Sequence, residues 1–80
     1  MSSVEAKPKT VARVHARDPY ETLIGIIVKH KDGTYELRLH YPPSINGEYH
    51  QLHPYPSYET AVYHASTITG GNLVIYEECT

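Results

Sequence analysis

The stretch LIGIIVKHKDGTYELRLHY, residues 23–41, decides the fold of this 80-residue chain. It begins with a run rich in β-branched residues, from Leu23 to His30, and such a run predicts a buried strand. The turn Lys31-Asp32-Gly33 follows, and Asp-Gly between two strand-like runs indicates a β-hairpin because both residues tolerate positive φ. From Thr34 to Tyr41 apolar and polar residues alternate, which predicts a second strand with one face in the core.

The second strand of this hairpin has an inward and an outward side. The side chains expected in the core are Tyr35, Leu37, Leu39 and Tyr41. Those expected to face away from it are Thr34, Glu36, Arg38 and His40. Downstream, Pro42-Pro43 ends the strand, Asn46-Gly47 offers a turn, and a third, shorter strand is predicted from Glu48 to His53. Because proline lacks a backbone donor, Pro54-Tyr55-Pro56 is expected to exclude regular structure.

One helix is predicted after these strands. Ser57 is a good N-cap, and Glu59 lies in the first turn, where the helix dipole favours a negative charge. Five residues fall at helical spacing on one face: Tyr58, Ala61, Val62, Ala65 and Ile68. Gly70-Gly71 is expected to end the helix, and Leu73 to Tyr76 to form a closing strand.

The first seventeen residues divide into a tail and a weak strand signal. Residues 1–9 are polar and show no periodicity, so we expect a disordered tail before a single domain at 10–80. Val11 to Arg17 alternates, with Ala12, Val14 and Ala16 on one side, and Asp18-Pro19 interrupts it. The pattern leaves open whether this segment joins the sheet. The chain is therefore predicted to be α+β, a three- to four-stranded antiparallel sheet in the order β-β-β-α-β with one helix on one face.

Composition bounds the function. The net charge of −2 is too small to draw the chain onto nucleic acid by its field alone. A single cysteine, Cys79, excludes an intramolecular disulfide and fits a reducing compartment. The start of the chain has no apolar signal segment, and no apolar run approaches the roughly 18 residues of a membrane span. These features predict a cytoplasmic protein.

No catalytic or metal-binding pattern is recognisable, so we expect a protein that is not an enzyme and needs no cofactor. His50 and His53 have an H-x-x-H spacing, but a strand would point them to opposite faces, and zinc needs three or four converging ligands. Cys79 follows Glu77 and Glu78, whose carboxylates disfavour a thiolate. Lys29, Lys31 and Arg38 cluster at the hairpin and offer a basic nucleic-acid face as an alternative function.

The tyrosine-rich and proline-rich segment from Tyr49 to Tyr58 is the strongest functional signal. The chain has eight tyrosines and contains neither Phe nor Trp, and tyrosine is enriched at protein interfaces. Three tyrosines have no evident place in the core: Tyr49, Tyr55 and Tyr63. We expect them to anchor a partner protein. The acidic residues expected to contact basic residues of that partner are Glu36, Glu48, Glu59, Glu77 and Glu78.

Two resemblances sharpen this hypothesis. Asp32-Gly33-Thr34-Tyr35, Pro42-Pro43, Gly47 and Ser57-Tyr58-Glu59-Thr60-Ala61 resemble HicB-type antitoxins over about residues 23–77. That resemblance implies binding to a small basic ribonuclease, although the DNA-binding segment that such antitoxins often append is absent. The whole chain is similar in format to small phage-encoded anti-CRISPR proteins, which are short, mildly acidic and α+β. This second resemblance carries no diagnostic motif. It implies a non-enzymatic inhibitor that binds a type I Cas surveillance complex in the host cytoplasm and blocks its access to DNA.

A homodimer is also expected. The run Leu23 to Val28 places apolar side chains on both faces of one strand, and one helix covers only one face of a sheet. The other face, or the edge strand Leu73 to Tyr76, then needs a partner, which a second copy of the chain can supply. A monomer remains the alternative if residues 11–17 join the sheet and the tail shields the open side.

Overall fold

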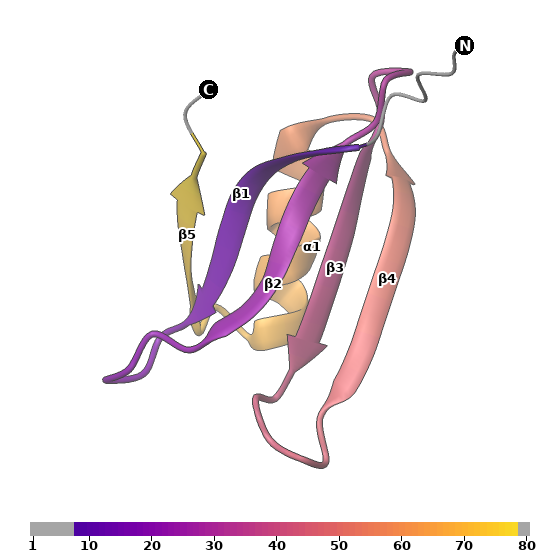
Figure 1. The fold of residues 1–80 in the computed structure, drawn as a ribbon. Helices are drawn as coiled ribbons and strands as arrows, with labels where there is room; N and C mark the ends of the chain where they lie inside the picture. The colour runs from indigo at the N-terminus through magenta and orange to yellow at the C-terminus, as the bar shows by residue number, and fades with distance from the viewer. Residues whose placement is uncertain (1–7, 79–80) are drawn as a thin grey trace, which may run out of the picture.

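The computed structural model describes residues 8–78, which form one five-stranded sheet and one helix (Figure 1). The elements are β1 (Lys9–Ala16), β2 (Leu23–Lys29), β3 (Tyr35–Tyr41), β4 (Glu48–Tyr55), α1 (Tyr58–Thr69) and β5 (Leu73–Glu77). The strands lie in the order β4-β3-β2-β1-β5, and each is antiparallel to its neighbours. The predicted α+β class, with one helix on one face of an antiparallel sheet, is confirmed.

The helix connects the two edges of the sheet. Strand β4 is one edge and β5 the other, so the connection through α1 passes from edge to edge on a single side of the sheet, behind the strands in Figure 1. The opposite side of the sheet, called here the open face, has no element of residues 8–78 packed over it. The arrangement therefore separates a covered face, which builds the core, from a face available for contacts.

The core lies between α1 and the covered face. Alternation in β1 puts Ala12, Val14 and Ala16 together on the covered side, where all three are buried. Leu37 and Leu39 of β3 face Ile27 and Gly25 of β2 across the register. The helix contributes Ala61 and Ala65 from the face that its 3.6-residue period predicted. The predicted inward positions of Leu37 and Leu39 are confirmed, as are the shared sides predicted for the β1 and α1 residues.

Local turn and cap chemistry explains where the elements end. Gly33 has φ of 92° in the β2–β3 turn, a conformation that other residues rarely adopt. Asp32 fixes the same turn by accepting hydrogen bonds from the amide and hydroxyl of Thr34. Ser57 caps α1 by accepting from the Thr60 amide, and Gly70, at φ of 64°, ends the helix in the left-handed conformation.

Three boundaries differ from the sequence-based expectation. Strand β1 belongs to the sheet, lies between β2 and β5, and supplies a fifth strand. It begins at Lys9, inside the predicted tail, and residues 1–7 of that tail lie outside the described residues. Strand β4 continues through Pro54 to Tyr55, so the expected loop there was wrong. An edge strand tolerates proline because one row of its backbone groups has no partner strand.

The helix that residues 8–78 contain, α1, is not long and apolar enough to cross a membrane.

Candidate functional site

The open face is built from the residues that alternate with the core positions. Strand register aligns one row of side chains across all five strands: Tyr76, Arg13, Ile26, Arg38 and Gln51. Val28 and Glu36 face each other in a second row, and His40 and Tyr49 in a third. The face is therefore mixed, with aliphatic, aromatic and basic groups side by side.

A buried carboxylate organises the centre of this face. Glu36 is only 3% exposed, although it lies on the side of the sheet away from the helix. Its Oε2 accepts from Arg38 Nε at 2.9 Å and from Gln51 Nε2 at 2.6 Å. Its Oε1 lies 2.7 Å from His30 Nε2 and 3.5 Å from Arg38 Nη2. Three side chains from β3, β4 and the β2–β3 turn thus converge on one acid.

This network keeps Glu36 ionised. The hydrogen bond from Arg38 is the main cause that lowers the pKa of Glu36 to about 2, and Gln51 and His30 lower it further against the opposing effect of burial. Glu36 in turn raises the pKa of Arg38 through the same hydrogen bond. The pair is therefore charged across the physiological range, and Arg38 is held in one orientation.

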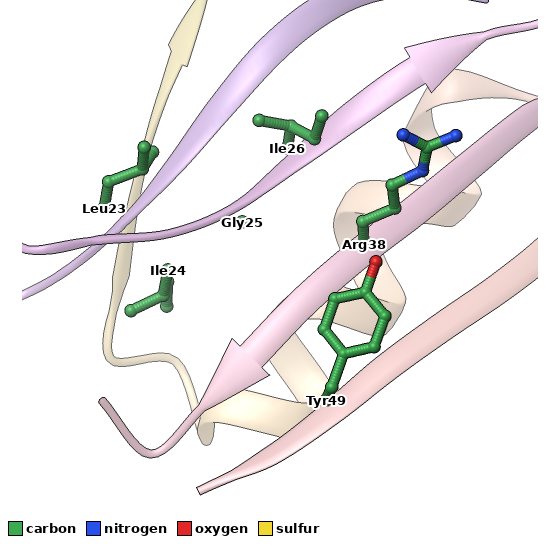
Figure 2. A pocket seen from close by; sticks show the side chains of 6 residues that line it. All are labelled: Leu23, Ile24, Gly25, Ile26, Arg38 and Tyr49. Atoms are coloured by element: carbon green, nitrogen blue, oxygen red, sulfur yellow. The ribbon is translucent and has the colours of Figure 1, made fainter. Parts of the chain in front are cut away.

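A shallow pocket of about 320 Å³ opens beside Arg38 (Figure 2). We call it the Arg38 pocket, and its lining residues are Leu23, Ile24, Gly25, Ile26, Arg38 and Tyr49. In Figure 2 the Tyr49 ring reaches from β4 toward the stem of Arg38, while Leu23 and Ile26 stand on the opposite side. The pocket is mainly apolar, with one cation and one phenol at its β3–β4 side.

Two of the lining side chains are large, apolar and exposed. Leu23 is 56% exposed and Tyr49 is 59% exposed. Tyr20 and Ile45, which are more exposed still, lie in the β1–β2 and β3–β4 loops, and both loops leave the sheet at the same end (Figure 1). These exposed apolar residues thus lie toward one end of the sheet. Concentration of this kind is typical of an interaction surface.

The β5 side of the open face is fixed by a second polar cluster. His15 Nδ1 lies 2.6 Å from the backbone oxygen of Glu21, which can only accept, so His15 donates from Nδ1. The Tyr76 hydroxyl donates to Glu21 Oε1 at 2.6 Å, and its ring packs edge-on against His15. These contacts tie the β1–β2 loop to β5.

The structure separates the three tyrosines predicted as anchors. Tyr49 lies on the open face, and Tyr63 is exposed on α1, on the other side of the molecule. Tyr55 is only 8% exposed, because its ring packs in the core and its hydroxyl contacts His64 Nδ1 on α1. The prediction that Tyr55 is a surface anchor was therefore wrong: β4 extends further than expected and turns this ring inward.

The five predicted acidic contacts do not form one surface either. Glu36 is buried and already paired, so the expectation that it lies on an exposed contact surface was wrong. Glu48 lies at the β4 edge and Glu59 in the first turn of the helix. Glu77 and Glu78 lie at the β5 end, where Glu78 pairs with Arg13 at 2.8 Å. The other four of the predicted five are exposed, and they are spread over three sides.

The basic cluster predicted at the hairpin is also divided. The Lys29 ammonium lies 5.8 Å from the centre of the Tyr35 ring, on the covered side, whereas Arg38 lies on the open face.

In the part of the chain that the structure describes, no three His, Cys, Asp or Glu residues gather in a metal-binding arrangement. His50 pairs with Leu39 toward the covered face, and His53 stacks on His30 with ring centres 4.2 Å apart. Cys79 lies outside the described residues.

Sequence reasoning missed the Arg38 pocket. The signal was present, because Leu23 to Val28 carries apolar residues at both odd and even positions. The sequence could not predict the register shift in the β1–β2 pairing between Val14 and His15. This shift places both Ile24 and Gly25 on the covered side. Leu23 and Ile26 are consequently left together on the open face.

Comparison with known proteins adds no identification: no family model matches the chain, and no curated protein or solved structure is significantly similar to it.

Proposed function

We propose that this chain is a non-enzymatic protein-binding inhibitor that docks on its partner through the open face. The observation that carries the proposal is the cluster of exposed Leu23 and Tyr49 around the Arg38 pocket, on a sheet face that the helix leaves uncovered. Aromatic and arginine side chains beside a small apolar depression are the residue types that dominate binding energy at protein interfaces.

The partner in this proposal is a type I Cas surveillance complex in the host cytoplasm, whose access to DNA the chain would block. Support for this choice comes from the resemblance in size, charge and α+β format to phage anti-CRISPR proteins. The structure adds a rigid sheet with one exposed face, which is a suitable platform for a standard protein contact.

The test is inhibition of target-DNA binding by a purified type I surveillance complex, followed by electrophoretic mobility shift. We expect the wild-type chain to prevent the shift at a stoichiometric ratio. Leu23→Lys and Tyr49→Ala are expected to weaken inhibition at least tenfold, because loss of a hot-spot side chain costs about 2 kcal/mol. Tyr63→Ala, which removes a still more exposed tyrosine on α1, is the matched control and should inhibit normally.

Two results would contradict this proposal in different ways. If no surveillance complex is inhibited but a lysate protein is captured through Leu23 and Tyr49, the face is right and the partner is wrong. If Tyr63→Ala abolishes binding while Leu23→Lys does not, the outer side of the helix is the contact surface and the open face has another role.

A HicB-like antitoxin is the second candidate. The order β2-β3-β4-α1-β5 reproduces the hairpin, third strand, helix and closing strand of that resemblance. Strand β1, however, lies between β2 and β5 and is an addition to it. Rescue of cells from a ribonuclease toxin by co-expression of this chain would favour the antitoxin over the anti-CRISPR proposal.

We also propose that the chain is a homodimer. Strand β5 is an edge of the sheet and carries neither Pro nor Lys within Leu73–Glu77, so a second copy can pair with it. Dimerisation at this edge leaves both open faces available to the inhibited partner.

A further inference from the structure

The Arg38 pocket combines an apolar depression with hydrogen-bond donors held in place. The Arg38 guanidinium has five N–H groups. One on Nε and one on Nη2 donate hydrogen bonds to Glu36. The remaining N–H groups have no acceptor among residues 8–78. The Arg38 side chain is 36% exposed, whereas that of Glu36 is 5% exposed, so the ion pair presents its cationic side to solvent.

The arrangement below Arg38 fixes its direction. Burying a carboxylate is unfavourable unless several donors compensate it, and an apolar residue at position 36 would avoid that penalty. Here His30 and Gln51 hold the Glu36 carboxylate from two further elements, so the acid is itself immobilised. Glu36 thus acts as a positioning residue, because its bonds hold the guanidinium at the rim of the pocket, on the side away from Tyr49, before any partner arrives (Figure 2).

The size and lining of the pocket limit what can enter. At about 320 Å³ it lies at the lower end of the roughly 300–1,000 Å³ range of ligand pockets, which suits one side chain of a partner. Leu23 and Ile26 present aliphatic walls, and Tyr49 an aromatic one. An aliphatic side chain would therefore fill the depression.

Charge complementarity opposes a second copy of this chain as the occupant. The carboxylates of residues 8–78 that lie on this side are already engaged. Glu36 holds Arg38, Glu21 accepts from Tyr76, and Glu78 pairs with Arg13. A second open face would thus bring another arginine, and each of these three carboxylates would already have a partner.

We infer that the Arg38 pocket binds an aliphatic side chain of a partner protein that lies next to a carboxylate, with the carboxylate received by Arg38. This inference rests on the proposed protein-binding function and names the chemistry that the open face recognises. Arginine suits the role because its planar N–H groups can hold a carboxylate by two parallel bonds.

The test uses the full-length chain, labelled with ¹⁵N, and small probes at pH 7 followed by amide chemical shifts. The main probe is N-acetyl-L-leucine, which joins an aliphatic side chain to a carboxylate. Its matched control is N-acetyl-L-leucinamide, which has the same side chain and no charge. We expect saturable shifts around Leu23, Ile26, Arg38 and Tyr49 with a Kd on the order of millimolar, and binding at least fivefold weaker for the amide.

Two variants separate a site from a structural network. Arg38→Gln is expected to abolish the preference for the carboxylate probe. Glu36→Gln retains the shape of the side chain but loses its charge, so the preference should fall several-fold although Arg38 is present. Tyr63→Ala, on the helix, should bind both probes as the wild type does. Amide shifts of the unliganded variants report whether each one folds.

Each opposing outcome is specific. Equal affinity for the two leucine probes, or shifts that map elsewhere, overturns the inference. No shift at probe concentrations up to about 20 mM also overturns it, since that limit lies well above the expected Kd. Salt-sensitive shifts of the same amides by octathymidine would assign the face to single-stranded nucleic acid, and dilution-dependent shifts without a probe would assign it to a second copy. If the leucine probes fail while Leu23→Lys still abolishes inhibition of the partner, the proposed function stands and only this chemistry falls.

Discussion

Four donor atoms lie within hydrogen-bonding distance of the Glu36 carboxylate: Arg38 Nε, Arg38 Nη2, Gln51 Nε2 and His30 Nε2. Most of these bonds would be weakened by a proton on the acid, so folding must hold Glu36 in its ionised form. The consequence is a pH dependence of stability with a defined sign. Because the folded pKa, at about 2, is below the ordinary 4.5, the unfolded chain binds the proton more readily.

We therefore predict that Glu36 stabilises the fold fully above pH 4.5 and that this contribution is lost as the pH falls toward about 2. This difference between the folded and the ordinary pKa of Glu36 corresponds to a contribution on the order of 3 kcal/mol to the free energy of unfolding. Urea unfolding at pH 6 and pH 3 measures it. Glu36→Gln should be less stable at pH 6 and should lose less stability between the two pH values. An unchanged pH dependence in this variant would show that other carboxylates are responsible.

A second residue-level prediction separates two tyrosines that look alike in the sequence. Tyr55 packs in the core, and its burial raises the pKa of its hydroxyl, whereas the Tyr49 ring is mostly in solvent. Tyr55→Ala should lower the free energy of unfolding by about 3 kcal/mol, the usual cost of removing a core aromatic ring. Tyr49→Ala should change it by less than about 0.5 kcal/mol and act on binding alone. Thermal unfolding followed by circular dichroism distinguishes the two, and equal destabilisation would contradict the assigned positions.

The sequence predicted side-chain direction well where a strand was regular. Leu37 and Leu39, and Ala12 with Val14, all face inward as their alternation indicated. It failed at Glu36 and Tyr55 for different reasons. An outward position on a strand says nothing about the neighbours that bury it, and Glu36 depends on Gln51, which comes from another strand. Tyr55 depends on a proline-containing edge strand that local rules disfavour.

At the scale of elements, β2 and β3 approach each other unusually closely at Gly25. A Cβ atom at this position would lie 2.3 Å from the Arg38 backbone oxygen and 2.9 Å from the Leu39 Cα. Both of these atoms belong to the backbone, so no side-chain rotation can relieve the contact. The glycine thus allows the close pairing of the two strands that also line the Arg38 pocket.

We predict that Gly25→Ala destabilises the fold by about 1–3 kcal/mol, the usual cost of forcing extra atoms into a packed region. Chemical denaturation measures this change, and Lys31→Ala in the exposed hairpin turn is a suitable control. Because the strands must separate locally, the amide shifts of Ile26 and Arg38 should also move. A stability equal to that of the wild type would mean that β2 and β3 are not held this close.

Element types could be predicted because their signals are local: the Asp-Gly turn, the Ser57 cap, and Gly70 at the end of the helix. The position of β1 could not. Its alternation indicated a strand, but its place between β2 and β5 depends on pairing with residues 73–77, about sixty positions away. The same long-range pairing decides which strand is the sheet edge, and hence which backbone is free.

At the scale of the whole molecule, residues 8–78 leave one sheet face and two strand edges without cover from one another. The edges differ in chemistry. Strand β4 carries Pro54, which hinders the addition of another strand, whereas β5 carries the apolar run from Leu73 to Tyr76 and has no proline. A second copy can therefore join the sheets at β5 in antiparallel fashion around a two-fold axis.

We predict that the chain is a homodimer through β5, with a mass of about twice 9.1 kDa by light scattering under reducing conditions at micromolar concentrations. Val74→Lys, within this edge strand, should produce a monomer of 9.1 kDa because a charge on an edge strand opposes strand addition. Tyr63→Lys, which adds the same charge on α1, should remain dimeric. Leu23→Lys should also remain dimeric, since in this arrangement the open face contacts the inhibited partner and not the second copy. A wild-type mass near 9.1 kDa would exclude the dimer, and a monomeric Leu23→Lys with a dimeric Val74→Lys would move the contact from the β5 edge to the open face.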